Sequence, residues 1–278
     1  MLCQRVSSFF LILINNLLDF FSGGILSIME NNNIRVIKKT LLLLSFLARK
    51  NSSAGVTEIA AALEMPKATV HRILATLLED NVVLKNDDGR YRIGPTVLLW
   101  GSGFKFNAGI IDLAQPFMMR LRDESRETVH LSVYNKGVAQ YAERYNSPQN
   151  VTLRWSKLGS ELPLYCTAAG RAIMSRLPAG ELDAYLEAET LEPRTAKTVV
   201  DRDKLRELLS IFRKQGWAWE NEENEEDIRC VGAAIIDHTD YPVAALSLTA
   251  PTFRFSDEDS LKFGEKLAAA ARAISRMI

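Results

Sequence analysis

Apolar positions between residues 56 and 79 recur with the period of an α-helix, and the pattern is interrupted once, at Glu64-Met65-Pro66. Pro66 disfavours helical geometry at the residue before it and suits the first turn of a new helix. One helix therefore ends and another begins within a few residues. The apolar positions fall on one face of each segment: Ile59, Ala60 and Leu63 on the first, then Val70, Ile73, Leu74 and Leu77 on the second. This pattern predicts a helix-turn-helix.

The outward face of the second predicted helix is small, hydroxylated and cationic. Ala68 and Ala75 leave room for close approach to a major groove, and the longer side chains offer donors for phosphates and base edges. We predict that five of these side chains contact DNA: Lys67, Thr69, His71, Arg72 and Thr76. For this segment taken alone, an ordinary helical hairpin with a solvated face is the alternative.

The flanking segments favour the DNA-binding interpretation. Residues 34–46 have helical periodicity, as a first supporting helix should, and residues 81–94 predict two short strands around the turn Asp88-Gly89. Three cations, Lys85, Arg90 and Arg92, surround that turn, where they would contact backbone phosphate beside the groove. The sequence thus predicts a winged helix-turn-helix over residues 33–94.

Gly94 and Pro95 mark a boundary, after which two helical pieces are expected with a break at Gly101–Gly103. The first piece, within residues 95–108, is interpreted as a linker helix. It contains Leu98, Leu99 and Trp100, which are unusually apolar for a linker and are expected to pack against another subunit or the neighbouring domain.

From Thr128 the pattern changes to alternation, which is typical of strands. Two strands flank the hairpin signal Asn135-Lys136-Gly137, and residues 151–157 predict a third strand. Helices are expected after Thr167, a good N-cap, and further strands and helices follow to the C-terminus. The order predicts an α+β fold, in which residues 109–278 form an antiparallel sheet flanked by helices.

The composition agrees with two domains and adds a charge asymmetry. A chain of 278 residues with 47% hydrophobic content more naturally forms two domains than one. The net charge is zero, but residues 33–94 contain ten Lys/Arg and six Asp/Glu, whereas residues 109–278 contain 22 and 26. The positive excess therefore lies on the predicted DNA-binding module. Because this excess is modest, tight binding is expected to need two or more copies of the module, as in symmetric dimers on paired half-sites.

The cysteines and the first residues bear on the compartment. Cys3, Cys166 and Cys230 have no CxxC spacing and make no even disulfide framework, which favours a reducing cytoplasm. The apolar run in residues 1–28 is interrupted by polar residues and is too short to span a bilayer. We expect this segment to be an extension that is unstructured or absent from the native protein, and we expect no membrane partner. A membrane-tethered regulator is the alternative.

An enzyme is the competing class. His71, His130 and His238 are not spaced as metal ligands, and the sequence has no Gly-rich phosphate motif or nucleophile elbow. We therefore predict no catalytic residue, no metal and no cofactor. A Cys166 nucleophile assisted by His130 remains as the enzymatic alternative.

Three separated blocks, PKATVHRILATL, RWSKLGSELPLYCTAAGRAIMS and RCVGAAIID with PVAALSLTAP, resemble the IclR family of bacterial transcriptional regulators. The resemblance covers nearly everything from Ile34 to the C-terminus. It implies a winged DNA-binding domain, a linker helix and a GAF-like effector domain, assembled as a dimer or a dimer of dimers. The implied function is that of a cytoplasmic regulator, a repressor rather than an activator, that binds double-stranded operator DNA and a small organic acid.

The resemblance also implies a cup between the sheet and the helix that follows PLYCTAAG. Its expected lining is Leu162, Ala168, Ala169, Glu220, Ile228, Cys230, Ser247 and Thr249, with Val151 and Arg154 near the mouth. The residue types agree with an acid ligand. Backbone N–H groups at a helix N-terminus suit a carboxylate, hydroxyls two apart on a strand face one side, and arginine pairs with carboxylate bidentately.

Each of these features also has a plainer interpretation. The Ala-Ala-Gly run allows close helix–sheet packing, the two hydroxyls can satisfy local backbone groups, and Arg154 can be a surface side chain. Cys166 and Cys230 are more commonly core thiols than ligand contacts.

Two positions depart from the family pattern, since many relatives carry glycine where Glu64 and Asp227 stand. The turn at Glu64 is therefore expected either to cost about 1 kcal/mol in backbone strain or to bend differently. Asp227 belongs to the acidic run ENEENEED, for which a solvated loop is expected. Within that run, Glu220 would repel an anion unless it is protonated or binds a sugar hydroxyl. The sequence therefore favours a polyhydroxylated sugar acid or another hydroxy acid as the effector.

Overall fold

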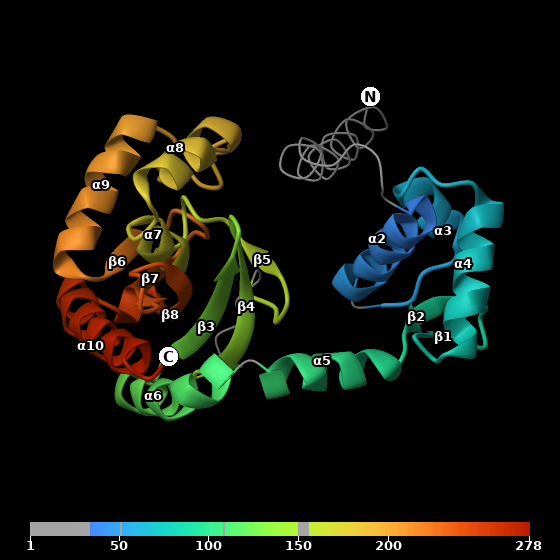
Figure 1. Ribbon diagram of the computed structural model, residues 1–278, viewed down its shortest axis with the longest axis horizontal. Coiled ribbons are helices and arrows are strands. Elements are labelled where there is room, and N and C mark those ends of the chain that lie inside the picture. The colour runs from blue at the N-terminus through green and yellow to red at the C-terminus, as the bar shows by residue number, and fades with distance from the viewer. Residues whose placement is uncertain (1–33, 51, 108, 150–155) are drawn as a thin grey trace. The chain divides into compact units, whose positions relative to one another are not determined.

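The computed structural model describes residues 34–50, 52–107, 109–149 and 156–278. These residues form two compact units that divide after Asn107 (Figure 1). The sequence-based expectations for residues 1–28, for Val151 and Arg154, and for most of the strand at 151–157 lie outside the described residues. Of the described helices, none is both long and apolar enough to cross a bilayer.

The first unit is a winged helix-turn-helix, as predicted. Helices α2 (Arg35–Lys50), α3 (Val56–Ala62) and α4 (Lys67–Glu79) precede an antiparallel hairpin of β1 (Val83–Lys85) and β2 (Tyr91–Ile93). Their apolar faces meet in one core, which includes Leu43, Leu47, Ile59, Val70, Leu74, Val83 and Tyr91. A bridge between Ala54 and Tyr91 ties the start of α3 to the hairpin. The amphipathic pattern thus determines both the helices and the way they pack.

The turn between α3 and α4 has the geometry expected from the sequence. Glu64 lies in the left-handed region with a φ of 50°, and Pro66, with a φ of −57°, occupies the N-cap of α4. Asp227, the other position where relatives carry glycine, is also left-handed, with a φ of 61°. A side chain in this conformation costs on the order of 1 kcal/mol relative to glycine, so both sites carry local strain.

The linker region differs from the prediction. Helix α5 (Thr96–Asn107) runs without interruption through Gly101–Gly103, where we expected a break. Glycine lowers helix propensity by about 1 kcal/mol but keeps its N–H, so the backbone ladder can continue through it. Leu98, Leu99 and Trp100 are exposed in the single chain, and what covers them stays a prediction. Helix α6 (Gly109–Ser125) begins the second unit.

The second unit contains a six-stranded antiparallel sheet of order β5-β4-β3-β8-β7-β6. The strands are β3 (Thr128–Asn135), β4 (Val138–Tyr145), β5 (Glu161–Leu162), β6 (Ala218–Asn221), β7 (Ile228–Ile236) and β8 (Pro242–Pro251). The predicted β3–β4 hairpin is confirmed, with Asn135 opposite Val138. A short 3₁₀ helix, η1 (Thr252–Arg254), follows β8. The unit is therefore α+β, as expected.

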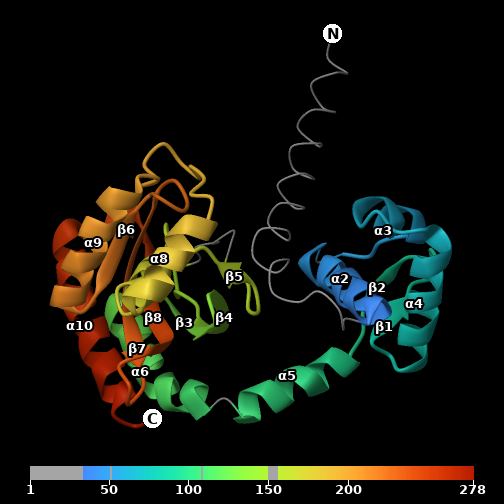
Figure 2. The same ribbon diagram turned by 45° about the horizontal axis from the view of Figure 1, so that its top comes forward.

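Helices cover the sheet on both faces. On one face, α6 and α10 (Asp257–Ser275) pack side by side over an apolar core that includes Val129, Leu131, Val231, Leu246 and Leu248 (Figure 2). Helix α7 (Ala168–Met174) packs on β7 and β8 at the other face, where α9 (Arg202–Gln215) contacts α7, and α8 (Ala179–Ala188) joins them in the chain. On the face covered by α7, β3, β7 and β8 carry buried polar side chains, among them His130, Ser247 and Thr249.

Glycines allow α7 to lie directly against its neighbours. A Cβ at Gly170 would fall 2.3 Å from the Cα of Leu164, and one at Gly232 would fall 2.9 Å from the carbonyl of Ala168. Thr167 caps the helix as predicted, because its Oγ1 accepts from the N–H of Gly170 at 3.1 Å. The close-packing interpretation of the Ala-Ala-Gly run is therefore confirmed.

Candidate functional site

The outer face of α4 is free for a partner. Lys67, His71, Arg72 and Thr76 are exposed, and Thr69 is half-buried. The hydroxyl of Thr76 donates to the carbonyl of Arg72 at 3.2 Å, which holds this part of the face in order. The buried stripe of Val70, Ile73 and Leu74 fixes the helix from behind. The predicted donors therefore share one rigid and accessible surface.

The three cations of the wing are not equivalent. Arg90 is directed inward, where it donates to the carbonyl of Ser53 at 2.7 Å and pairs with Glu58 at 3.0 Å. Arg92 is exposed and donates to the amide oxygen of Asn86 at 3.2 Å. Lys85 is exposed, with its ammonium 5.6 Å from the centre of the Tyr91 ring. Arg90 therefore braces the hairpin against α3, while Lys85 and Arg92 project from it.

In the second unit, one patch of the sheet facing α7 is polar. Cross-strand partners share a face of a sheet, and the register aligns Glu220 with Cys230 and Cys230 with Thr249. The neighbouring row aligns Gly232, Ser247 and His130. Ser132 follows His130 by two residues on β3. We call this set the polar face: His130, Ser132, Glu220, Cys230, Ser247 and Thr249.

Several polar atoms on and beside this face have no hydrogen-bond partner among the described residues. They are both ring nitrogens of His130, the hydroxyls of Ser132 and Ser156, and Oε1 of Glu220, and all are buried. More than nine in ten buried polar groups in folded proteins are paired, with protein or with ordered water. A cluster of exceptions on one face is therefore a strong indication of a binding site.

The pKa values of Glu220 and His130, two ionisable groups of the polar face, are shifted in opposite directions. Burial raises the pKa of Glu220 to about 7, although its Oε2 accepts from the backbone N–H of Glu223 at 2.9 Å. Burial, together with the charge of Arg144, lowers the pKa of His130 to about 3. The imidazole is therefore neutral at physiological pH and offers one donor and one acceptor, while Glu220 changes charge near neutrality.

Residues 222–227 of the acidic run form a loop in which Glu226 and Asp227 are exposed, but the run is not solvated throughout as we expected. Glu220 is 0% exposed in β6, and Glu223 is 4% exposed. Glu223 forms a bidentate pair with the fully buried Arg171 of α7, with distances of 2.6 and 2.5 Å. Arg171 also donates to the carbonyl of Tyr165 at 2.7 Å. The correction has a physical reason: a buried arginine 52 residues away supplies the charge and donors that allow a carboxylate in this run to leave water.

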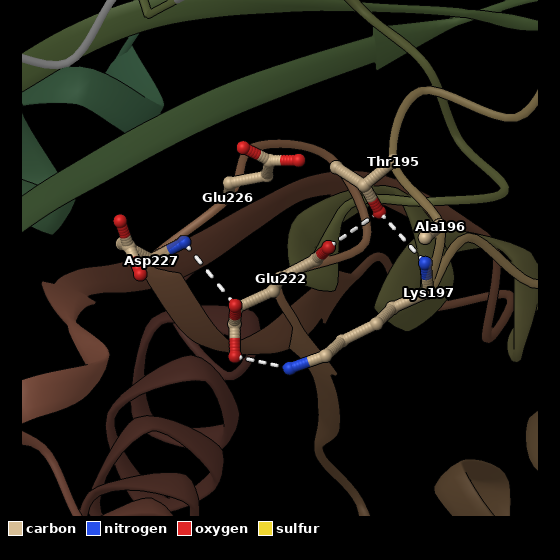
Figure 3. Close-up of a pocket in the computed structure, with 6 residues that line it drawn as sticks. All are labelled: Thr195, Ala196, Lys197, Glu222, Glu226 and Asp227. Carbon is tan, nitrogen blue, oxygen red and sulfur yellow. Dashed lines mark hydrogen bonds and ion pairs between the residues drawn. The ribbon is translucent and has the colours of Figure 1, made fainter.

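A shallow hollow lies beside the β6–β7 turn and is lined by Thr195, Ala196, Lys197, Glu222, Glu226 and Asp227 (Figure 3). Its lysine is already paired with Glu222 at 2.5 Å, and its threonine donates to the carbonyl of Glu222 at 2.6 Å. None of the residues predicted to bind the effector lines it. The unpartnered atoms of the polar face are the better indication of a ligand site.

The structure brings together most of the predicted effector residues. Glu220, Cys230, Ser247 and Thr249 lie on the polar face, and Ala168 and Ala169 begin the helix above it. Leu162 belongs to the core beneath α7, and Ile228 begins β7 on the same side as Cys230. Sequence reasoning did not include His130 and Ser132 in this set, although the polar residues at every second position of β3 placed them on one face.

Cys166 and His130 do not form the nucleophile–base pair of the enzymatic alternative in this structure. The Cys166 thiol donates to the amide oxygen of Asn224 at 3.7 Å, and neither ring nitrogen of His130 has a partner among the described residues. Burial raises the pKa of Cys166 to about 12, so the sulfur is a thiol at neutral pH rather than a nucleophilic thiolate. In the described part of the chain, no group of three or more His, Cys, Asp or Glu side chains is arranged to hold a metal ion.

Comparison with known proteins agrees with this geometry. The family model described as bacterial transcriptional regulator IclR C-terminal matches residues 106–276, and the IclR helix-turn-helix domain matches residues 36–87. The chain belongs to the IclR family. The HTH-type transcriptional regulator XynR of Escherichia coli is 30% identical over 249 residues, which cover 88% of this chain and 97% of XynR. The transcriptional repressor IclR of the same organism is 28% identical, over 87% of this chain and 89% of the repressor.

A solved structure shows the same arrangement within this family. The crystal structure of Thermotoga maritima IclR is 31% identical in sequence and has a TM-score of 0.72, covering 88% of this chain and 99% of that protein. This IclR-family chain is therefore a DNA-binding transcriptional regulator and not an enzyme. Its first unit is the DNA-binding domain, and its second unit is an effector-binding domain for a small molecule.

Proposed function

We propose that this IclR-family regulator is a repressor that controls the catabolism of a small hydroxylated organic acid, in the first instance a sugar acid. The acid binds on the polar face beneath α7 and changes the affinity for operator DNA. The observation that carries the proposal is the cluster of buried, unpartnered polar atoms of His130, Ser132 and Glu220. The similarity to a transcriptional repressor supports the sign of regulation.

The chemistry of these atoms favours hydroxyl groups on the ligand. A neutral imidazole, a serine hydroxyl and a carboxyl that titrates near pH 7 both donate and accept, as ligand hydroxyls do. A purely hydrocarbon acid would leave the buried groups unpaired, at a cost of about 1–3 kcal/mol each. Sites built to hydrogen-bond a hydroxyl reject analogues that lack it by large factors. The polar face therefore selects for hydroxylated compounds.

The DNA-binding proposal uses the outer face of α4 and the wing. Lys67, Thr69, His71, Arg72 and Thr76 enter the major groove, and Lys85 and Arg92 contact backbone phosphate. Arg90 supports the wing from behind. It is the least suited of the predicted DNA contacts, because its guanidinium already donates to Ser53 and Glu58. The small positive excess of the domain requires paired copies, so the working form in the cytoplasm is a dimer or a dimer of dimers on double-stranded DNA.

The ligand acts by favouring one arrangement of the paired subunits. A ligand shifts an equilibrium only by its difference in affinity for the two states. Because α5 joins the two domains, residues 98–106 are the proposed carriers of this coupling. Spacing between paired recognition helices then determines operator affinity.

The test combines ligand binding and DNA binding on the full chain. A thermal-shift screen of sugar acids is followed by fluorescence anisotropy with DNA from the protein's own promoter and with random duplex. We expect a preference for the promoter that a stabilising acid reduces. Ser247→Ala should leave promoter binding intact and blunt the response to the acid. Loss of promoter binding in Ser247→Ala, or equal affinity for promoter and random DNA, would contradict the proposal.

A further inference from the structure

The loop between α8 and α9 is fastened to the turn between β6 and β7. The hydroxyl of Thr195 donates to the carbonyl of Glu222, and that of Thr198 donates to the carbonyl of Glu223, each at 2.6 Å. The backbone N–H of Val199 donates to the Glu223 carboxylate at 2.9 Å. Figure 3 shows Thr195 and Lys197 of this loop against Glu222. The loop is thus held by the same carboxylate that anchors Arg171 of α7.

This fastening positions Arg194 beside the segment that leads into α7. The backbone N–H of Arg194 donates to Thr198 at 3.0 Å, and its Nη1 donates to the amide oxygen of Asn224 at 3.3 Å. The same oxygen of Asn224 accepts from the Cys166 thiol. The guanidinium and Cys166, the residue before the α7 N-cap, therefore share one hydrogen-bond acceptor.

The charge of Arg194 acts on the buried groups around the polar face. Burial raises the pKa values of Cys166, Tyr165 and Tyr141, and for each of them the positive charge of Arg194 opposes the rise. Tyr141 packs against the ring of His130, with ring centres 5.1 Å apart, and its pKa also responds to the charge of Glu220. The field of the guanidinium therefore reaches Tyr141, the ring that packs against His130.

Arg194 also differs from the neighbouring cations in having no carboxylate partner. Among the described residues, no carboxylate lies within ion-pair distance of it, whereas Arg171 is paired with Glu223 and Lys197 with Glu222. A guanidinium has five donors in a planar fork, and Arg194 uses part of this fork for Asn224 and for the side chain of Tyr165. The remaining donors are available for an anion.

We propose that Arg194 is the anion anchor of the effector site: its guanidinium binds the carboxylate of the acid whose hydroxyls are bound by Glu220, His130 and Ser132. The inference rests on the proposed function. Arginine and carboxylate match as a planar, bidentate pair. Helix α7 is a weaker anion site, because it has only seven residues and Thr167 already takes the N–H of Gly170. In addition, bonds from Thr195, Thr198 and Val199 fasten the loop to the β6–β7 turn, and the Arg194 side chain adds one further bond, to Asn224. The loop therefore keeps most of its attachment when this side chain is exchanged, and Arg194 acts as a specificity residue.

The experiment compares Arg194→Gln, Arg194→Lys and a matched control, Arg206→Gln. Arg206 is an exposed arginine of α9 in the same unit, paired with Asp183 at 2.5 Å. The probes are aldonic acids from threonate to gluconate and the matching neutral polyols, tested on the full chain by thermal shift and calorimetry. The melting temperature without ligand and the binding to promoter DNA are measured for each variant.

We expect wild type to bind an aldonate in preference to its polyol. Arg194→Gln should lower the affinity for the aldonate roughly 10- to 100-fold, as the loss of a charged hydrogen bond does. The affinity for the polyol should change little. Arg194→Lys should be intermediate, and Arg206→Gln should resemble wild type. Unliganded melting temperature and promoter binding of Arg194→Gln should match the control.

Three outcomes would overturn the inference. If Arg194→Gln binds the acid as tightly as wild type does, the anchor lies elsewhere and the proposed function stands. If Arg194→Gln loses affinity for the acid and for the polyol equally, the residue supports the structure of the loop and does not bind the anion. If no aldonate binds wild type, the proposed sugar-acid effector fails, and the anchor fails with it.

Discussion

Replacing Glu220 with glutamine removes a carboxyl that the fold keeps at 0% exposure with one oxygen unpaired. Burial is the main reason that its pKa rises from 4.5 to about 7, and the rise is opposed by the neighbouring Cys230 thiol and by the hydrogen bond from the N–H of Glu223. Glutamine keeps the shape of the side chain and can still accept from Glu223. The substitution therefore isolates the effect of the proton.

The direction in which stability changes with pH follows from the number of protons that Glu220 binds in the folded and in the unfolded state. Between pH 4.5 and pH 7 the folded protein keeps a proton on Glu220 that the unfolded chain has lost. The contribution of this group to stability is therefore present below pH 4.5, falls as the pH rises to about 7, and then stays constant. A shift of this size corresponds to about 3 kcal/mol. Relative to wild type, Glu220→Gln should gain about this much stability from pH 4.5 to pH 8.

Urea unfolding of the full chain at a series of pH values measures this difference. Trp217 and Trp219 lie in and beside β6, and Trp217 is buried, so tryptophan fluorescence follows the unfolding of this unit. Glu187→Gln, an exposed position on α8, serves as the control and should parallel wild type. A stability difference between Glu220→Gln and wild type that does not change with pH would refute the reasoning, because the carboxyl would then titrate alike in both states.

Three further substitutions test other parts of the structure. Gly232→Ala should destabilise the effector domain by about 1–3 kcal/mol in thermal unfolding, because the added Cβ would fall 2.9 Å from the backbone of Ala168; an unchanged melting temperature would show that α7 shifts freely. Glu64→Gly should stabilise the DNA-binding domain by up to about 1 kcal/mol, since it relieves a φ of 50°, and a loss of stability would contradict this. Arg72→Ala should weaken promoter binding by about 1–3 kcal/mol and relax the preference at one base pair; a uniform loss on all duplexes would indicate a phosphate contact instead.

Periodicity predicted the DNA-binding domain well because its fold depends on local signals. The stripe of Val70, Ile73 and Leu74 defines α4, and Pro66 defines its start. The left-handed residue at Glu64 followed from the positions where relatives carry glycine. By contrast, the prediction of a break at Gly101–Gly103 was wrong, because glycine weakens a helix without removing a backbone hydrogen bond.

The effector site was only partly predictable because its key contacts join distant segments. The burial of Glu223 depends on Arg171, and the position of Arg194 depends on bonds from Thr195 and Thr198 to the β6–β7 turn. No local pattern in the sequence records such pairings. The polar positions of β3 were visible as an alternation, but only the assembled sheet shows that His130 and Ser132 lack partners.

The way the α8–α9 loop is attached has an evolutionary consequence. Thr195, Thr198 and Val199 make three of its bonds to the β6–β7 turn, so an exchange of the side chain at position 194 removes the bond to Asn224 and leaves these three in place. A single amino-acid substitution at position 194 can therefore change the charge of the ligand that the site binds, while the surrounding fold is kept. The ligand preference of such a sensor can thus change through substitutions that leave the other contacts of the loop in place.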